Sequence, residues 1–530
     1  MTMLNVAIVG GGLSGLALAN SLHTHNCDWT LFEARPRLGG RVLSVPRADG
    51  GSRVDLGPSW FWPDIQPRLA ALIAQLGLAT LEQHDSGTVL CLDDPDKSAA
   101  PVAFPDAHGG ARRLAGGMVT LTDTLARKLP AERLCHGHAL IRVHNHGNHV
   151  ALVFAHAGRE VIVNARHVVL ALPPRLAARV EFSPPLDESL RATLEATPTW
   201  MADRAKVVIA YPRAHWREAG HAGNAFVTHE QAVIGEIYDA CESNHAALGG
   251  FLALTPPLRA AFRDGLPMLL ANQMAQVFGP ALESGAQHYQ DWAAEEFTCA
   301  PLDQMPAAPN AHLVQGHLLL RRPAWQGRLL FGGSESAAAG AGYLEGALDA
   351  ATRIARELAP HVTGAAERAT AGGNAACNAR FAGWVEARRG EALPHYRRHL
   401  NQELAAQQRE QQTQRALLAT AEGIYSAALE EIGTLPLDTR GLHVERGRSA
   451  LTPALLDPFD GFINGLIAEA VAFNRTSCAL SNFPFEHAPD EIYLQAIKRD
   501  LVAAWREFAL AANAAILART PTPIVEAVHG

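Results

Sequence analysis

The sequence has few of the features that mark a secreted or membrane-spanning protein. Its seven cysteines are scattered along the chain and predict reduced thiols rather than a disulfide framework. No apolar run reaches the roughly 18 residues that a membrane-spanning helix needs. The sequence also lacks the charged segment followed by an apolar segment that is typical of a signal peptide. We therefore expect a cytoplasmic chain without a transmembrane segment.

The sequence also lacks an excess of positive charge. Its net charge of −8, with no basic amphipathic helix, argues against binding to nucleic acid or to a membrane surface. Histidines cluster at 136–138 and 144–146, but they flank strand-like segments and lack the spacing of a tetrahedral zinc site, so we predict no metal. A chain of 530 residues exceeds the size of a single hydrophobic core, and we expect two or three domains.

What the sequence does contain is a glycine-rich turn close to its start, between an apolar strand and a helix of small residues. Gly10 would turn tightly out of the strand, Gly12 would let a pyrophosphate approach the backbone, and Gly15 would allow close packing of the helix. Glu33 ends the next strand, where its carboxylate can accept hydrogen bonds from ribose hydroxyls. The triplet alone is a weak signal, but strand, helix, second strand and acid in this order predict a dinucleotide site.

Five further motifs are spread along the chain. They are Glu-Ala-Arg-Pro-Arg-Leu-Gly-Gly-Arg at 33–41, Asp-Leu-Gly-Pro-Ser-Trp at 55–60, Gly-Gly-Met at 116–118, an apolar strand with two prolines at 167–174, and the glycine-rich stretch 327–347. Together they resemble the flavin-containing amine oxidases, the family of monoamine and polyamine oxidases. The similarity runs from about residue 4 to 360, and it implies that the dinucleotide is FAD.

The resemblance also implies the fold class, α/β with a doubly wound, parallel-sheet, Rossmann-like FAD-binding domain, together with an α+β substrate domain. The C-terminal region, which the resemblance does not reach, is predicted to be helical from its composition and periodicity. The expected domains are 1–60, 110–182 and 325–365 for FAD, 61–109 and 183–324 for the substrate, and 375–530 for a helical accessory domain.

The residues expected to bind FAD follow from the glycine motif and from the positions that match the family. They are Gly10, Gly12, Leu13, Ser14, Gly15, Glu33, Ala34, Arg35, Gly40, Arg41, Gly57, Pro58, Ser59, Val143, Gly333, Glu335, Gly342 and Tyr343. Cys299 lies near the region where some relatives tether FAD through cysteine, but about two residues away from it. We therefore predict that FAD is bound noncovalently.

Two residues are the candidates for catalysis. Lys206 lies at the entrance of a predicted buried strand, and the resemblance implies a lysine that hydrogen-bonds through water to flavin N5. Tyr343 falls where the family has one wall of an aromatic cage beside the flavin, which would guide an amine by apolar contact and ring electrostatics. The partner wall departs from the family, because Gln315 stands where a tyrosine is usual. Trp60 and Trp292 complete the expected substrate pocket.

These residues predict an FAD-dependent amine oxidase. A primary or secondary amine would lose a hydride to flavin N5 and become an imine, and molecular oxygen would reoxidise the flavin to give hydrogen peroxide. One alternative is an FAD-dependent desaturase or dehydrogenase of an apolar or cyclic substrate, because relatives of the same architecture have that activity. A second alternative is a noncatalytic flavoprotein that recruits a partner through its C-terminal helices.

Three acids, Glu230, Glu236 and Asp239, could bind the second cationic end of a diamine, although each is more typical of a surface or structural acid. Beyond residue 370 the helical pattern is clearest at 381–429 and 492–517. The apolar faces of these helices favour an accessory domain or a homodimer interface over a second active site.

Overall fold

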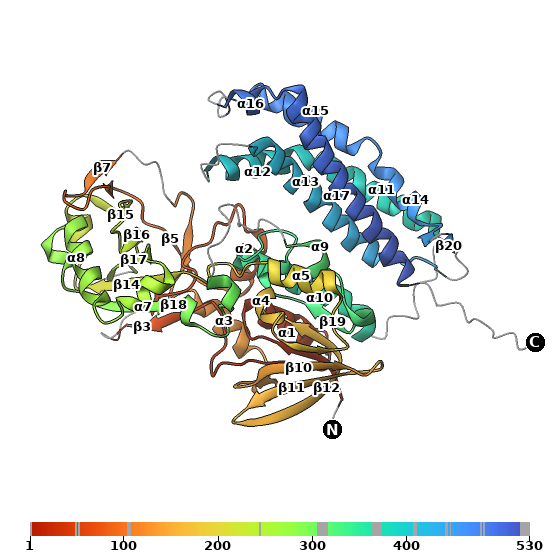
Figure 1. Ribbon diagram of the computed structural model, residues 1–530, viewed down its shortest axis with the longest axis horizontal. Helices are drawn as coiled ribbons and strands as arrows, with labels where there is room; N and C mark the ends of the chain where they lie inside the picture. The colour runs from red at the N-terminus through yellow and green to blue at the C-terminus, as the bar shows by residue number, and fades with distance from the viewer. Residues whose placement is uncertain are drawn as a thin grey trace, which may run out of the picture. The chain divides into compact units, whose positions relative to one another are not determined.

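The protein is described by a computed structural model that covers residues 3–47, 50, 53–102, 108–242, 245–304, 316–362, 374–405, 411–439, 444–445, 447–477, 480 and 483–519. The chain forms two compact units, Met1–Ala355 and Arg356–Gly530. The first unit holds two large β-sheets, and the second is built mainly of helices (Figure 1).

The first sheet has eight strands. Seven of them lie in the order β13 (Glu181–Ser183), β10 (Ala139–Asn145), β11 (Val150–His156), β12 (Arg159–Leu170), β1 (Met3–Val9), β2 (Trp29–Phe32) and β9 (Leu134–Cys135), and β19 (Leu329–Phe331) pairs with β12. β1 pairs in parallel with β12 and β2, and β12 pairs in parallel with β19. The parallel core predicted from the glycine motif is confirmed.

β12 joins two parts of this sheet that the sequence suggested as separate strands. Its first half pairs antiparallel with β11, which itself pairs antiparallel with β10. Its second half, from Asn164, pairs in parallel with β1. β10, β11 and the first half of β12 therefore form an antiparallel meander that is continuous with the parallel core. β1 and the end of β12 are buried, as is usual for parallel strands covered on both faces.

The second sheet has seven strands, in the order β18 (Ala286–Asp291), β14 (Ala205–Tyr211), β17 (Ala246–Leu252), β16 (Ile234–Asp239), β15 (His221–Val227), β6 (Thr88–Leu92) and β7 (Ala100–Val102). All its pairs are antiparallel except β15 with β6. In Figure 1 this sheet and α8 lie together, away from α1 and the meander. The two sheets also have separate hydrophobic cores.

Short ribbons and helices complete the first unit. The ribbons pair β3 (Ser44–Pro46) with β4 (Arg53–Asp55) and β5 (Thr80–Glu82) with β8 (Arg112–Leu114). The helices are α1 (Leu13–Thr24), α2 (Pro67–Gln75), α3 (Val119–Arg127), α4 (Pro174–Ala177), α5 (Glu188–Ala196), α6 (His215–Glu218), α7 (Pro256–Ala261), α8 (Leu266–Phe278), α9 (Leu318–Arg321) and α10 (Leu344–Val362). α10 begins in this unit and extends past its last residue, Ala355.

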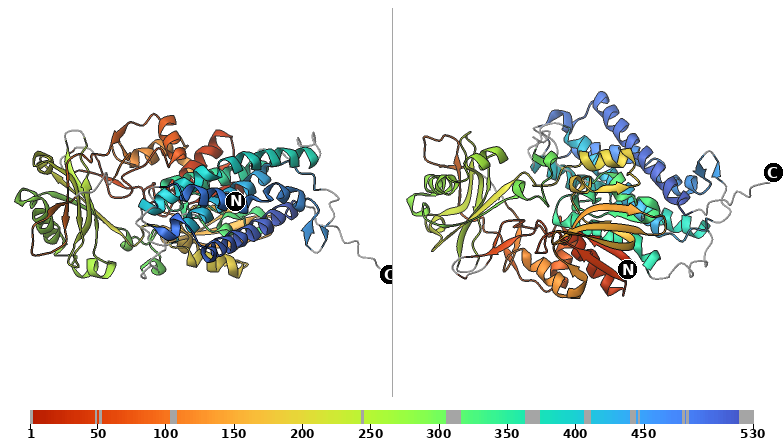
Figure 2. Two further views of the ribbon diagram at one scale, coloured as in Figure 1. Left: turned by 90° about the horizontal axis from the view of Figure 1, so that it is seen from above. Right: turned by 60° about the horizontal axis from the view of Figure 1, so that its bottom comes forward.

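The second unit is a helical bundle with its own apolar core. Its helices are α11 (Asn374–Gly390), α12 (Ala392–Ala405), α13 (Gln412–Thr434), α14 (Thr452–Leu456), α15 (Phe462–Asn474), α16 (Pro484–His487) and α17 (Glu491–Leu517), with a small ribbon of β20 (Val444–Glu445) and β21 (Arg448–Ser449). α13 and α17 lie side by side, and the cyan and blue helices stay together in both views of Figure 2. Within the described residues, no helix is long and apolar enough to cross a membrane.

Candidate active site

A cavity of about 820 Å³ lies in the first unit, in contact with elements of both sheets. This volume is within the range of about 300–1,000 Å³ that is usual for small-molecule and cofactor sites. The sequence-predicted residues that line it are Gly10, Gly12, Leu13, Ser14, Glu33, Ala34, Arg35, Gly40, Arg41, Gly57, Pro58, Ser59, Trp60, Lys206, Trp292, Gly333, Gly342 and Tyr343. Segments that are far apart in the sequence therefore meet at one site.

The glycine turn at one end of the cavity is shaped for a ligand. Gly10 has φ +109°, and a side chain there would meet the Ala171 carbonyl, so only glycine fits this turn. A Cβ on Gly15 would lie 2.0 Å from the Gly10 carbonyl oxygen. A Cβ on Gly12, in contrast, would have only the Gly40 Cα within 4 Å. The space beside Gly12 is therefore open to a pyrophosphate at the N-terminus of α1, where free amides favour an anion.

Glu33 connects this turn to the second glycine segment. One carboxylate oxygen accepts a hydrogen bond from Gly11 N at 2.6 Å, and the other accepts from Arg35 N at 2.9 Å. Gly39 N also donates to Gly11 O at 2.8 Å. Glu33 thus holds both turns around the cavity that it lines, in addition to the ribose contact proposed for it.

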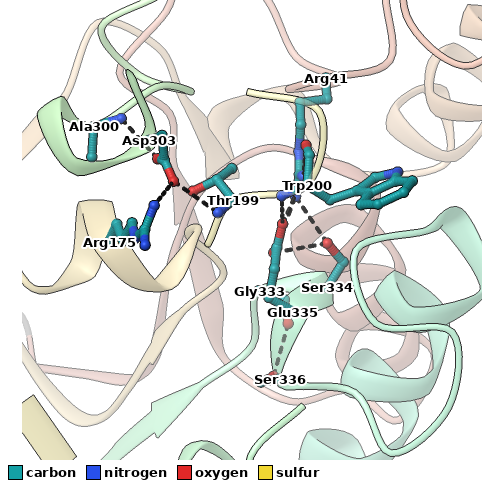
Figure 3. Close-up of polar contacts among 10 residues, drawn as sticks. All are labelled: Arg41, Arg175, Thr199, Trp200, Ala300, Asp303, Gly333, Ser334, Glu335 and Ser336. Atoms are coloured by element: carbon teal, nitrogen blue, oxygen red, sulfur yellow. Dashed lines mark hydrogen bonds and ion pairs between the residues drawn. The ribbon is translucent and has the colours of Figure 1, made fainter. Parts of the chain in front are cut away.

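Arg41 lines the cavity, and Glu335 lies behind it (Figure 3). The Glu335 carboxylate accepts from Arg41 at 2.7 and 3.1 Å, from Ser334 Oγ at 2.9 Å and from Trp200 N at 3.2 Å. Burial alone would raise the pKa of Glu335, but the Arg41 guanidinium holds this pKa below its usual value. We expected Glu335 to contact the cofactor. It does not line the cavity, because its oxygens hold Arg41 and Trp200 instead.

Two other residues expected to bind FAD also lie outside the lining. Gly15 packs beneath Gly10, where its lack of a side chain brings α1 close to β1. Val143 is fully buried in the core of the meander, and His138 and Leu140 from the same part of the chain line the cavity instead. The position of a residue within β10 decides whether its side chain faces the cavity, and the sequence pattern around Val143 does not reveal that position.

Lys206 is buried although it lies near the end of a strand. All seven residues of β14 are buried, and Lys206 is only 2% exposed. Its Nζ donates hydrogen bonds to Gly57 O and Ser59 Oγ, each at 2.6 Å. The loop 57–59 therefore holds the lysine at the cavity, rather than letting it extend to water.

Burial favours the neutral form of Lys206, whereas the nearby ring faces favour its charged form. The rings of Trp60, Tyr238 and Phe251 lie 5.3–5.8 Å from Nζ, and Phe251 is directly opposite Lys206 in the β14–β17 ladder. Burial lowers the pKa of Lys206 from 10.5 to about 7, and the charge of Asp55 partly offsets this effect. A lysine with this pKa can exist in either protonation state near neutral pH, which suits proton transfer or hydrogen bonding at a reacting group.

Aromatic side chains line the cavity, among them Trp60, Trp62, Phe251, Trp292 and Tyr343. Trp292 Nε1 donates to Leu56 O at 3.0 Å, so this tryptophan also holds the loop before Gly57. Gln315, expected opposite Tyr343, lies outside the described residues.

Trp200 is a cavity residue that the sequence patterns did not reveal. Its ring lies against that of Tyr343, with ring centroids 4.9 Å apart and planes inclined by 39°. Its position six residues before Lys206, just after Thr197-Pro198-Thr199, was the available signal. Phe251 was missed as well, and only strand register reveals it.

Cys299 and the three substrate-domain acids lie away from the cavity lining. Among the described residues no cysteine lines the cavity, although residues 296–298 do, and burial raises the pKa of Cys299 to about 11. These observations agree with noncovalent FAD, because a reactive thiolate would have to reach the ligand. Asp239 is buried and bonded to Arg217 and Trp216, and Glu230 and Glu236 do not line the cavity either. None of the three is placed to bind a diamine there.

No group of three or more possible metal ligands occurs among the described residues. His108, which contacts Trp60, is instead held between Asp85 and Glu236, at 3.1 and 3.7 Å.

Comparisons with known proteins agree on one family. The profile for flavin containing amine oxidoreductases matches residues 99–359, and that for an NAD(P)-binding Rossmann-like domain matches residues 8–76. The flavin-containing amine oxidase of Danio rerio is 28% identical over 457 residues, covering 67% of this chain and 85% of its own length. The Homo sapiens amine oxidase B is 24% identical over 453 residues, covering 67% and 86%.

Solved structures share the fold. Cyclohexylamine oxidase from Brevibacterium oxydans aligns with a TM-score of 0.57 at 20% identity, covering 68% of this chain and 99% of its own. Wild-type putrescine oxidase bound to putrescine aligns with a TM-score of 0.55 at 20% identity, covering 68% and 99%. The glycine cradle, the open space at Gly12 and the buried lysine fit FAD, and the comparisons support a flavin-dependent oxidoreductase related to the flavin-containing amine oxidases.

Proposed function

We propose that this protein oxidises a primary or secondary amine to the imine, with transfer of a hydride to flavin N5 and reoxidation by molecular oxygen to hydrogen peroxide. The observation that carries the proposal is Lys206, held at 2.6 Å by Gly57 O and Ser59 Oγ beside aromatic side chains that line the cavity. Bound FAD would supply the acceptor for the hydride.

The residues of the chain would bind and orient the amine. Trp60 and Phe251 offer apolar faces that exclude water and favour the uncharged amine, whose nitrogen lone pair assists loss of the α-hydride, and Tyr343 adds a further ring to the lining. Lys206, whose pKa is about 7, would then hold a proton or a water molecule beside the reacting atoms. The role proposed for Lys206 is in the reoxidation of the flavin, and the role proposed for Tyr343 is to place the substrate.

The test is anaerobic bleaching of the flavin absorbance by a panel of amines, amino acids and polyamines, followed by air. Wild type should bleach with at least one amine. In Lys206→Met, reoxidation in air should slow by about 10²-fold, the scale of one positioned acid–base group. Lys128→Met, which removes an exposed lysine, should behave as wild type.

Either of two results would contradict the proposal. If no amine bleaches the wild-type flavin but an apolar substrate does, with electrons passing to a quinone dye, the desaturase or dehydrogenase alternative is favoured. If no substrate of either class bleaches it, the noncatalytic flavoprotein is favoured.

A further inference from the structure

The segment Thr199-Trp200-Met201 is held by hydrogen bonds to side chains from distant parts of the chain. It follows α5 and leads into β14, the strand of Lys206. Met201 has φ +60°, a conformation that is strained for a residue other than glycine. Such a conformation persists when the surrounding contacts impose it, and these contacts are visible in Figure 3.

Two buried carboxylates accept hydrogen bonds from consecutive backbone amides of this segment. Asp303 Oδ1 accepts from Thr199 N at 2.9 Å and also from Arg175 Nη1 at 2.8 Å. Glu335 Oε1 accepts from Trp200 N at 3.2 Å. This corner of the chain, residues 199–201, is thus fixed by groups far apart from it in the sequence.

The other side of the corner is equally constrained. Arg41, which pairs with Glu335, also donates to Trp200 O at 3.0 Å, so both backbone groups of Trp200 are bonded to this ion pair. A Cβ on Gly342 would lie 2.5 Å from the Trp200 Cβ, so a glycine is needed next to Tyr343 for the tryptophan to fit. The result of both constraints is a fixed ring that lines the cavity against Tyr343.

The geometry points to Trp200 as the second aromatic wall of the amine pocket, a specificity-determining residue held in place by Asp303 and Glu335. This inference rests on the proposed function of the cavity. With centroids 4.9 Å apart, the Trp200 and Tyr343 rings touch each other and leave no slot between them. A substrate would therefore lie across one continuous aromatic surface, which selects amines that carry a ring over aliphatic amines that carry none.

The test separates binding from chemistry by using amines that have no α-hydrogen and cannot be oxidised to an imine. Cumylamine carries a ring and tert-butylamine does not, and calorimetric titration of the FAD-loaded full chain measures the Kd of each. Trp200→Ala should weaken cumylamine binding about tenfold, equivalent to about 1.4 kcal/mol, and change tert-butylamine binding by less than about twofold. Trp200→Phe should recover most of the loss. Trp325→Ala, which removes a tryptophan outside the cavity lining, is the matched control.

The positioning role of Asp303 is tested by Asp303→Asn. Its two oxygens accept from Thr199, Arg175 and Ala300, so an amide must turn its NH₂ toward at least one donor. The variant should lose part of the preference for cumylamine, and it should cause no further loss in the Trp200→Ala background. If Asp303 had only a structural role, the variant would bind both probes more weakly by the same factor. Alternatively, its melting temperature would fall while the ratio of the two Kd values stayed unchanged.

Failure of this inference can be told apart from failure of the proposed function. Equal effects of Trp200→Ala on both probes, or no measurable binding of cumylamine to wild type, would overturn the role of Trp200. Failure of benzylamine, cyclohexylamine and every other amine to bleach the wild-type flavin would overturn the proposed function, whatever the probes show.

Discussion

Gly12 and Gly15 differ in what occupies the space where a side chain would stand. A Cβ on Gly15 would meet the Gly10 carbonyl oxygen at 2.0 Å, which is a clash within the protein itself. A Cβ on Gly12 would have one neighbour, the Gly40 Cα at 4.0 Å, and Gly12 has an extended backbone that alanine can adopt. The constraint on Gly12 therefore comes from the ligand, and that on Gly15 comes from the fold.

This difference predicts opposite behaviour for two alanine variants. Gly12→Ala should fold with a melting temperature close to wild type in the absence of FAD, yet purify with little bound flavin. Gly15→Ala should be destabilised by about 1–3 kcal/mol even without FAD, because the helix must move away from the strand. Flavin content by absorbance and thermal melting of the FAD-free proteins measure the two effects. Normal flavin content in Gly12→Ala would contradict the assigned pyrophosphate site.

Lys206 makes stability depend on pH. Its pKa falls from 10.5 to about 7 on folding, so between these values the unfolded chain binds a proton that the native state does not. The free energy of unfolding therefore rises as the pH increases through this window, with a slope of at most about 1.4 kcal/mol per pH unit.

Lys206→Met should remove that dependence. The variant should be more stable than wild type at about pH 7, and the difference should shrink toward about pH 10. Urea unfolding of the FAD-free proteins at both pH values is the measurement. Lys128→Met should show no such trend, and a constant difference for Lys206→Met would mean that the lysine stays charged when buried.

Among the elements, α13 begins without a capping residue of its own. Gln411 precedes it with φ +60° and no side-chain cap, while Glu486 of α16 accepts hydrogen bonds from Gln412 N at 3.0 Å and Thr413 N at 2.9 Å. Asn474 is fully buried and donates to Thr413 Oγ1 and Glu486 O. One buried polar group thus joins α13, α15 and α16.

Glu486→Ala should destabilise the helical unit by about 2 kcal/mol, because two buried amides at the positive end of α13 lose their acceptor. Glu469→Ala, which removes an exposed acid from α15, should change stability by less than about 0.5 kcal/mol. Chemical denaturation followed by helical circular dichroism measures both. Equal small effects would show that water replaces the carboxylate at this helix end.

At the scale of the whole molecule, the two units have separate hydrophobic cores. The core of the second unit runs from Cys377 to Ile516, and the two large sheets of the first unit contribute no residue to it. The residues that line the FAD cavity all belong to the first unit.

Thermal unfolding should therefore show two transitions, of which only one depends on FAD. Removing FAD should lower the midpoint of the first-unit transition, because a ligand stabilises only the part that binds it. Glu486→Ala should lower the midpoint of the other. Scanning calorimetry of the FAD-loaded and FAD-free protein is the measurement, and a single transition that shifts as a whole would mean that the units unfold together.

Local patterns in the sequence determined the glycine turn and its acid, the buried strand of Lys206 and the helix predicted at 492–517, which the structure gives as Glu491–Leu517. Each depends on residues close together in the chain, where backbone sterics and periodic burial act directly. Only the tertiary structure decided that Phe251 faces Lys206, that Glu335 lies behind Arg41 and that Trp200 lies against Tyr343. Those contacts join segments 45 to 294 residues apart. Strand register and side-chain packing determine them, and local propensity encodes neither.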